Sequence, residues 1–186
     1  MTQQTARIEF NGAGEAAETR HRTFVATLED SPGVLNRVSS LVRRRKFNIV
    51  SLSVGRTHIH GESRMTLVVD CDADTARQLE AHLRKLICVL DVQDISHEPC
   101  LLRDLALVRL RVGARERMEV FQLLEVFQAR VIDVQPTSMI IEVTGDPTRI
   151  EGLAEVLRPY GIEEMVQCGA VAITTGTSGA AATPIR

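Results

Sequence analysis

The stretch Leu28-Glu29-Asp30-Ser31-Pro32-Gly33-Val34-Leu35-Asn36-Arg37-Val38 contains a strand end, a turn and a helix start. Before it, residues 23–28 alternate between apolar and polar side chains and are rich in β-formers, which predicts a strand. Ser31 is expected to cap the helix, with Pro32 at the first helical position, where a missing N–H costs nothing. The helix should continue to the basic run at 43–46, because apolar residues recur at helical spacing: Val34, Leu35, Val38, Leu41 and Val42.

The pattern that follows is dense and occurs twice. The first half has the predicted order βαββαβ, with further strands at 48–54, 64–70 and 89–95 and a helix at 73–86. The second half repeats this order, with strands at 105–112, 131–134, 139–143 and 162–167 and helices at 117–129 and 149–157. Ile49-Val50 aligns with Val131-Ile132, and Met65 aligns with Met139. An internal repeat of this length indicates two like domains in tandem.

A βαββαβ unit builds an antiparallel sheet with both helices on one face, the ferredoxin-like arrangement. The predicted fold class is therefore α+β, with two tandem ferredoxin-like domains at 21–97 and 98–175. A flexible leader at 1–20 and a disordered tail at 176–186 are expected to flank them. Each unit has only about 75–80 residues, so its own core is marginal. A homodimer that covers an open sheet face or joins sheet edges is expected.

The composition argues against several classes of protein. The chain has 186 residues, of which 44% are hydrophobic and 25% charged, as is typical of globular proteins. A net charge of -2 and an aromatic content of 3% argue against nucleic-acid binding, which needs basic surface or stacking rings. No membrane span or secretory signal is evident. Neither a CxxC pair nor zinc-ligand spacing is present, so reduced thiols in a cytoplasmic protein are expected of Cys71, Cys88, Cys100 and Cys168.

Three motifs favour structural explanations over functional ones. GAGEAA at 12–17 matches GxGxxA, but no amphipathic helix follows it. His58 and His60 lack the further ligands that a metal site needs, so a solvated hairpin loop is expected there. The run Arg43–Lys46 suits the C-terminal end of a helix, where cations complement the dipole. No catalytic constellation emerges by spacing, so enzymatic activity in this chain alone is the weaker hypothesis.

The turn at 30–33 has a functional interpretation beside the capping one. A helix N-terminus offers free N–H groups and a positive dipole end, which suit a carboxylate. Gly33 leaves room for close approach, and Asp30 can accept hydrogen bonds from an ammonium group. Such a turn suits a free α-amino acid, whereas an ordinary strand–helix connection is the alternative.

Three segments resemble one family. EDSPGVLNRVSSLVRRRKFNIVSLSVG at 29–55, SRMTLVVD at 63–70 and FQARVIDV at 127–134 resemble the small, regulatory subunits of acetolactate synthase, also called acetohydroxyacid synthase. These subunits contain ACT domains, which have the ferredoxin-like fold. The likeness spans roughly 20–175. Asp-x-x-Gly alone is shared by all ACT domains, whereas the combination of segments is far more specific.

The resemblance implies a regulatory role. Residues 21–97 would form an effector-binding ACT domain, and 98–175 a second regulatory domain. The effector, a branched-chain amino acid and usually valine, would lie between two first domains of a homodimer. Asn48 would reach it from the neighbouring subunit, and Ile49 would be an apolar wall residue. The strand–helix loop would supply Asp30, Ser31, Pro32, Gly33, Val34 and Leu35.

The resemblance also places the chemistry in another chain. A separate catalytic large subunit would carry thiamine diphosphate, Mg²⁺ and FAD and condense pyruvate in valine, leucine and isoleucine synthesis. The small subunit would hold no cofactor or metal of its own. It would activate the large subunit and confer feedback inhibition.

Two residues depart from the family pattern, and two other functions stay open. Lys46 stands where relatives often have a glycine as a left-handed cap, so that turn should be strained or closed differently. Asp30 stands where relatives carry Asn or Asp, and its charge bears on effector preference. One alternative is a stand-alone ACT-domain amino-acid sensor, although no helix-turn-helix is attached. The other is an acylphosphatase-like hydrolase, which would need an arginine where Asp30 stands.

Overall fold

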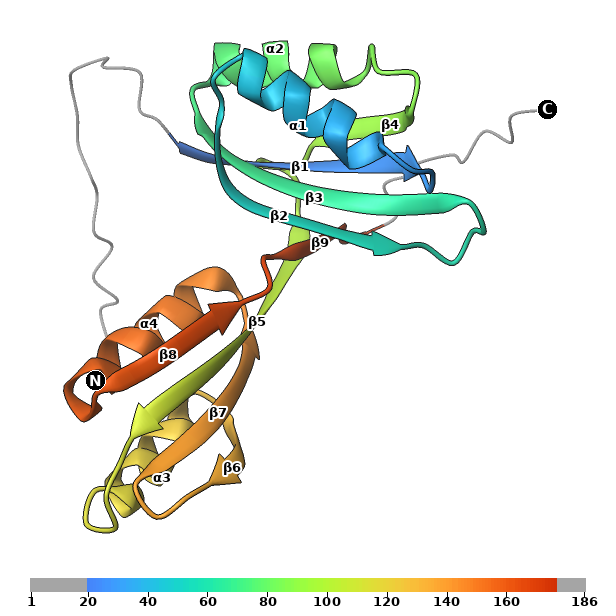
Figure 1. Ribbon diagram of the computed structural model, residues 1–186. Coiled ribbons are helices and arrows are strands. Elements are labelled where there is room, and N and C mark those ends of the chain that lie inside the picture. The colour runs from blue at the N-terminus through green and yellow to red at the C-terminus, as the bar shows by residue number, and fades with distance from the viewer. Residues whose placement is uncertain (1–19, 177–186) are drawn as a thin grey trace, which may run out of the picture.

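The first βαββαβ unit is an antiparallel sheet with two helices on one face (Figure 1). The computed structural model describes residues 20–176, so the expected leader at 1–20 and tail at 176–186 lie outside the described residues except for Arg20 and Gly176. Arg20 is not part of a leader but the first residue of a strand. The strand order of the first sheet is β2-β3-β1-β4. Its elements are β1 (Arg20–Glu29), α1 (Val34–Arg44), β2 (Asn48–Arg56), β3 (Glu62–Cys71), α2 (Ala73–Leu83) and β4 (Val89–Asp94).

The second unit repeats this arrangement with the order β6-β7-β5-β8. Its elements are β5 (Cys100–Arg111), α3 (Arg117–Val126), β6 (Arg130–Val134), β7 (Ser138–Gly145), α4 (Pro147–Leu157), the 3-10 turn η1 (Arg158–Tyr160), β8 (Ile162–Gln167) and β9 (Val171–Thr174). The predicted fold class, two tandem ferredoxin-like units, is confirmed.

The helical periodicity correctly identifies most of the buried face of α1. Val34, Val38, Leu41 and Val42 are buried against the first sheet. Leu35 was expected on the same face, but it is 46% exposed, because in the first turn of α1 it lies at the margin of the stripe formed by Val34, Val38 and Leu41. An apolar side chain therefore remains exposed next to the predicted effector loop.

The two units share unusual backbone features as well as topology. Each edge strand has a β-bulge at the aligned position, Val50 in β2 and Ile132 in β6. Each first helix ends in a left-handed residue that is not glycine, Lys46 with φ 58° and Gln128 with φ 48°. These shared details support the internal repeat read from the sequence.

The turn at Lys46 is a Schellman motif made without glycine. The Lys46 N–H donates to the carbonyl oxygen of Arg43 at 3.1 Å, and the Phe47 N–H donates to that of Val42 at 3.2 Å. The same pair of bonds surrounds Gln128 in the second unit. The expected departure is therefore a left-handed cap in which lysine bears the steric cost that a glycine would avoid.

The sequence analysis missed β9. This strand pairs with the first residues of β5, so that β5 begins at Cys100 rather than at the predicted 105. We call Cys100–Arg103 together with Val171–Thr174 the ribbon. It crosses the face of the first sheet opposite α1 and α2 (Figure 1). Its side chains Cys100, Leu102 and Ala172 pack on Val25 and Ile95 of that face.

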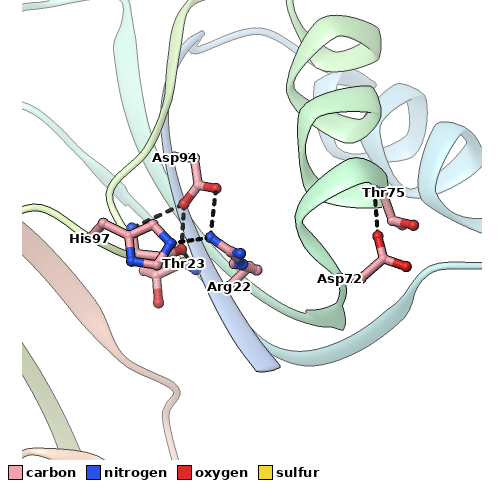
Figure 2. Close-up of polar contacts among 7 residues, drawn as sticks. Arg22, Thr23, Asp72, Thr75, Asp94 and His97 are labelled. Carbon is pink, nitrogen blue, oxygen red and sulfur yellow. Dashed lines mark hydrogen bonds and ion pairs between the residues drawn. The ribbon is translucent and has the colours of Figure 1, made fainter. Parts of the chain in front are cut away.

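Residues 94–97, at the end of β4 and just after it, contact β1 through hydrogen bonds and an ion pair (Figure 2). The Thr23 N–H donates to Ser96 Oγ at 2.9 Å, and Arg22 Nη1 lies 3.8 Å from a carboxylate oxygen of Asp94. Arg22 also contacts the His97 ring at 2.5 Å. These bonds fix the direction in which the chain passes from the first sheet into β5.

Candidate effector site

The predicted loop lies where β1 meets α1. The Asp30 N–H donates to the carbonyl oxygen of Gly61, in the β2–β3 hairpin turn, at 2.7 Å. The helix begins at Val34, and the residue before it is Gly33, with φ 86° and no side-chain cap. The predictions that Ser31 caps the helix and that Pro32 is its first residue are therefore wrong. The left-handed turn at Gly33 places both residues outside the helix.

This geometry leaves backbone donors open at the start of α1. The Val34 N–H makes only a long bond of 3.4 Å to the carbonyl oxygen of Ser31. Among the described residues, the N–H groups of Leu35 and Asn36 have no acceptor. A Cβ added at Gly33 would meet nothing within 4 Å beyond its chain neighbours, so the space beside Gly33 is open. Free N–H groups at a helix N-terminus favour an anion such as a carboxylate.

A charged pair lies at the first residue of the loop. Arg56 Nε is 3.5 Å from a carboxylate oxygen of Asp30, with side chains 88% and 42% exposed. At such exposure the attraction is weak, so both groups remain available to a ligand. The sequence analysis missed Arg56, because only the β2–β3 hairpin brings it beside Asp30. The loop thus has donors suited to a carboxylate and, in Asp30, an acceptor suited to an ammonium group.

The remaining predicted residues, Asn48 and Ile49, lie far from this loop within one chain. Asn48 pairs with Asp70 at one end of β3, whereas Glu29, next to the loop, pairs with Glu62 at the other end. The rise of a strand makes this separation about 26 Å. The structure therefore brings Asp30 to Leu35 together and leaves Asn48 and Ile49 at the opposite end of the sheet.

The strand that carries Asn48 is a sheet edge. β2 is the terminal strand of the first sheet, so one side of its backbone has no strand partner in the described chain. Its side chains Ile49, Val50 and Val54 are 38%, 46% and 37% exposed. A long edge with exposed apolar side chains favours pairing with another strand.

The other motifs lie outside this loop. His58 and His60 are exposed in the hairpin turn between β2 and β3. Among residues 20–176, no group of three or more His, Cys, Asp or Glu side chains could hold a metal ion. In the same range, no helix is long and apolar enough to cross a membrane.

The fold and this loop define a class of protein, a chain of two tandem ACT-type domains. Residues 25–91 match the family model of acetohydroxyacid synthase small subunit-like ACT domains, and 103–176 match that of the small subunit of acetolactate synthase. The chain belongs to the family of acetolactate synthase small subunits.

Individual relatives agree with this assignment. The chain is 42% identical to the acetolactate synthase small subunit of Mycolicibacterium smegmatis, over 87% of this chain and 95% of that protein. It is 39% identical to that of Bacillus subtilis, over 84% and 91% of the two chains. The crystal structure of the Thermotoga maritima acetolactate synthase small subunit superimposes with a TM-score of 0.78 at 33% identity, covering 84% of this chain and 98% of that one. The resemblance read from the sequence is confirmed.

Proposed function

We propose that this chain is the non-catalytic regulatory subunit of an acetolactate synthase. It binds a branched-chain amino acid, with valine as the first candidate, and transmits feedback inhibition to a catalytic large subunit that it also activates. That large subunit carries the thiamine diphosphate, Mg²⁺ and FAD of the reaction. Family membership and the open N–H groups beside Asp30 support this role.

The observation that carries the proposal is the placement of Asn48 and the loop at opposite ends of an edge strand. In a two-fold antiparallel pairing of two β2 edges centred on Leu52, Asn48 lies opposite Arg56 of the partner subunit. That places Asn48 next to the partner subunit's effector loop. Each homodimer then has two equivalent sites, and each site takes residues from both chains.

In such a site the effector has counterparts for each of its groups. Its carboxylate meets the open N–H groups at the start of α1, and its ammonium group meets Asp30. Exposed apolar side chains, Leu35 from one chain and Ile49 from the other, are available for an aliphatic side chain. Asn48 supplies an amide that can bond to either polar group of the ligand.

Complementation between two variants tests the shared site. Gly33→Asp damages the loop, and Asn48→Ala damages the contribution from the neighbour, so each variant homodimer should bind valine poorly. A heterodimer of the two has one site with both changes and one intact site. Differently tagged chains, refolded together and purified as heterodimers, should therefore regain about half of the wild-type valine sites in calorimetry. A site formed within one chain predicts no recovery, and that result would refute the shared site.

The regulatory role needs a second measurement. Pyruvate condensation by the catalytic large subunit of a relative, or of the same source, is assayed alone, with this chain, and with this chain plus valine. Stimulation by the chain and its reversal by valine are expected. Activity of the chain alone on pyruvate would contradict the assignment as a non-catalytic subunit.

A further inference from the structure

The ribbon and the residue before it, Ala170, are hydrogen-bonded to the first sheet at three points. Ser51 Oγ accepts from the Ala170 N–H at 3.2 Å, and Thr66 Oγ1 accepts from the Ala172 N–H at 3.3 Å. Arg64 Nη2 donates to the carbonyl oxygen of Ala172 at 3.2 Å. Thr66 is 2% exposed, and burial lowers the pKa of Arg64. The second unit is thus joined to β2 and β3 through the main chain around β9.

The main chain before β9 also approaches Ser51 closely at Gly169. Gly169 has φ 87°, and a Cβ built on it would lie 2.8 Å from Ser51 Oγ and 3.5 Å from the Leu52 carbonyl oxygen. A side chain there would be strained by this φ and would displace the Ser51 hydroxyl. Gly169 therefore allows the main chain to come close to the Ser51 hydroxyl.

Ser51 belongs to the strand that reaches the proposed effector site. It follows the bulge at Val50 and lies three residues after Asn48. Within the described chain, the bond to Ala170 is the one hydrogen bond between a β2 side chain and the second unit. A displacement of β2 along the sheet edge therefore acts directly on Ala170.

The second unit has a rigid connection on its side of this contact. The Asp104 carboxylate is buried and accepts from Gln167 Nε2 at 2.9 Å, Cys168 Sγ at 3.3 Å and the Leu105 N–H at 2.7 Å. These bonds tie the residues that precede Gly169 to β5, the central strand of the second sheet. A shift at Ala170 is thus carried into the sheet and not absorbed by a loose loop.

A cavity beside the contact leaves room for movement. Its volume is about 420 Å³, and it separates Val50 and Leu52 of the first sheet from Pro147 and Glu151 of α4. The two units are therefore not packed core to core at this point. The two cores are separate clusters, so a rigid-body tilt of the second unit about the ribbon would disrupt neither of them.

We propose that Ser51 is a positioning residue that couples occupancy of the effector site to the placement of the second unit. The inference rests on the proposed function and deepens it. An effector that holds the Asn48 end of β2 against a neighbouring subunit fixes Ser51, Ser51 fixes Ala170, and Ala170 fixes the second sheet through Asp104. Without the Ser51 hydroxyl, the effector still binds but its signal does not reach the second unit.

Three variants isolate this hydroxyl. Ser51→Ala removes the acceptor, and Ser51→Thr keeps a hydroxyl at a position that lines the cavity. Ser53→Ala is the matched control, because Ser53 lies on the same strand and the same face but makes no hydrogen bond to the ribbon in the described structure. Residue-resolved hydrogen exchange of the full chain, with and without valine, reads the Leu35 and Ala170 amides separately.

Valine should slow exchange at both amides in the wild type. In Ser51→Ala the response at Leu35 should persist, whereas Ala170 should exchange about fivefold faster and no longer respond, as the loss of about 1 kcal/mol implies. In the reconstituted complex, maximal inhibition by saturating valine, relative to each variant's own valine-free rate, should fall to about half or less in Ser51→Ala. Ser51→Thr should recover it, and Ser53→Ala should match the wild type.

The possible results distinguish a failure of the role of Ser51 from a failure of the effector site. Full inhibition and a normal Ala170 response in Ser51→Ala would overturn the role of Ser51 while leaving the effector site intact. Equal losses in Ser51→Ala and Ser53→Ala would also overturn it, because they would show a general weakening of β2. A wild type in which valine protects neither amide and inhibits nothing would refute the proposed function, and the inference with it.

Discussion

The two strand–helix loops of this chain have the same fold but opposite electrostatic character. In both loops, the N–H of the first residue donates to a carbonyl oxygen in a hairpin turn. Asp30 donates to the carbonyl oxygen of Gly61, and Val112 donates to that of Thr137. The residue before α3 is Glu116, whose carboxylate accepts from the Gly113 N–H at 3.2 Å, and Glu119 follows in the first turn. Neither helix has a side-chain cap, but the first turn of α1 also has no acid.

This difference indicates what separates a structural loop from a binding loop. An acid near a helix N-terminus is stabilising, so the carboxylate of Glu119 offsets the positive end of α3. The start of α1 lacks that stabilisation, so its positive end is not offset by a carboxylate of its own first turn. In a duplicated fold, the helix without an acid in its first turn marks the unit expected to bind an anion.

The largest expected effect tests whether equivalent core positions contribute equally. Leu79 of α2 and Leu153 of α4 occupy aligned positions, and both are fully buried. Leu79→Ala and Leu153→Ala should each lower the free energy of unfolding by about 2–5 kcal/mol, through lost apolar contact and the cavity left behind. Denaturant unfolding of the full chain measures both. A large loss in one variant alone would show that the two cores are not energetic equivalents.

The next prediction compares the two loops directly. Gly33→Asp places a negative charge before the open N–H groups of α1 and should weaken valine binding by at least about tenfold, or ~1.4 kcal/mol. Arg115→Asp, at the aligned position of the second unit, should change it by less than about twofold. Calorimetric titration of each full-length variant provides the affinities.

A neutral variant controls for the backbone at Gly33. Its φ of 86° penalises any side chain, and Asn and Asp tolerate this region about equally. Gly33→Asn should therefore weaken binding less than Gly33→Asp does. Equal losses would assign the effect to the backbone rather than to charge.

The third comparison concerns the left-handed caps. Lys46→Gly and Gln128→Gly should each raise the free energy of unfolding by about 0.5–1 kcal/mol, because glycine removes the steric cost of a positive φ that exceeds its own entropic cost. The two gains should be similar, since both residues lie in the same motif. The denaturant midpoint of each variant, compared at an unchanged dependence of unfolding free energy on denaturant, measures the gain. A lower free energy of unfolding in either variant would contradict the prediction.

The smallest effect is a pH dependence shared by both units. Asp72 and Asp146 cap α2 and α4 by accepting from the N–H groups of Thr75 and Arg149. The pKa of Asp72 is lowered chiefly by its bond from the Thr75 backbone, and that of Asp146 chiefly by the Thr148 hydroxyl. A lowered folded-state pKa means that the stabilisation is present above the unfolded value of about 3.9 and is lost as the pH falls through the folded value.

Asparagine removes this titration while keeping the cap. From pH 7 to pH 3, the melting temperature of the wild type should fall more steeply below about pH 4 than that of the Asp72→Asn, Asp146→Asn double variant. Each single variant, Asp72→Asn or Asp146→Asn, should remove a similar part of this pH dependence. Parallel curves for wild type and double variant would show that the caps do not titrate in this range.

The sequence predicts what depends on local pattern. Helical spacing at Val38 and Val42, repeated at Val120 and Leu124, identifies both first helices and hence the tandem fold. It fails where distant residues decide the outcome. Val171–Thr174 is too short to stand out as a strand, and its partner in β5 and its packing on Val25 follow only from the folded chain.

The loop predicted to bind the effector shows the same limit on a smaller scale. The turn at Gly33 could be located from Asp30-Ser31-Pro32-Gly33, but the helix start was misplaced, because Ser31 and Pro32 together resemble a cap and a first turn. Arg56 could not be predicted as a neighbour of Asp30, since the length of the hairpin decides the register. Composition gave no sign of either feature.

The position of β9 in the chain has a consequence for synthesis. The first sheet is complete once residue 94 has been made, yet the cluster of Val25 and Ile95 on its open face lacks Ala172 until Val171–Thr174 leaves the ribosome. N-terminal domains generally fold first, so this face is covered by Cys100 and Leu102 alone while the rest of the second unit is translated. Incompletely covered apolar surface favours aggregation of the nascent chain, and the last of the described strands to emerge completes its cover.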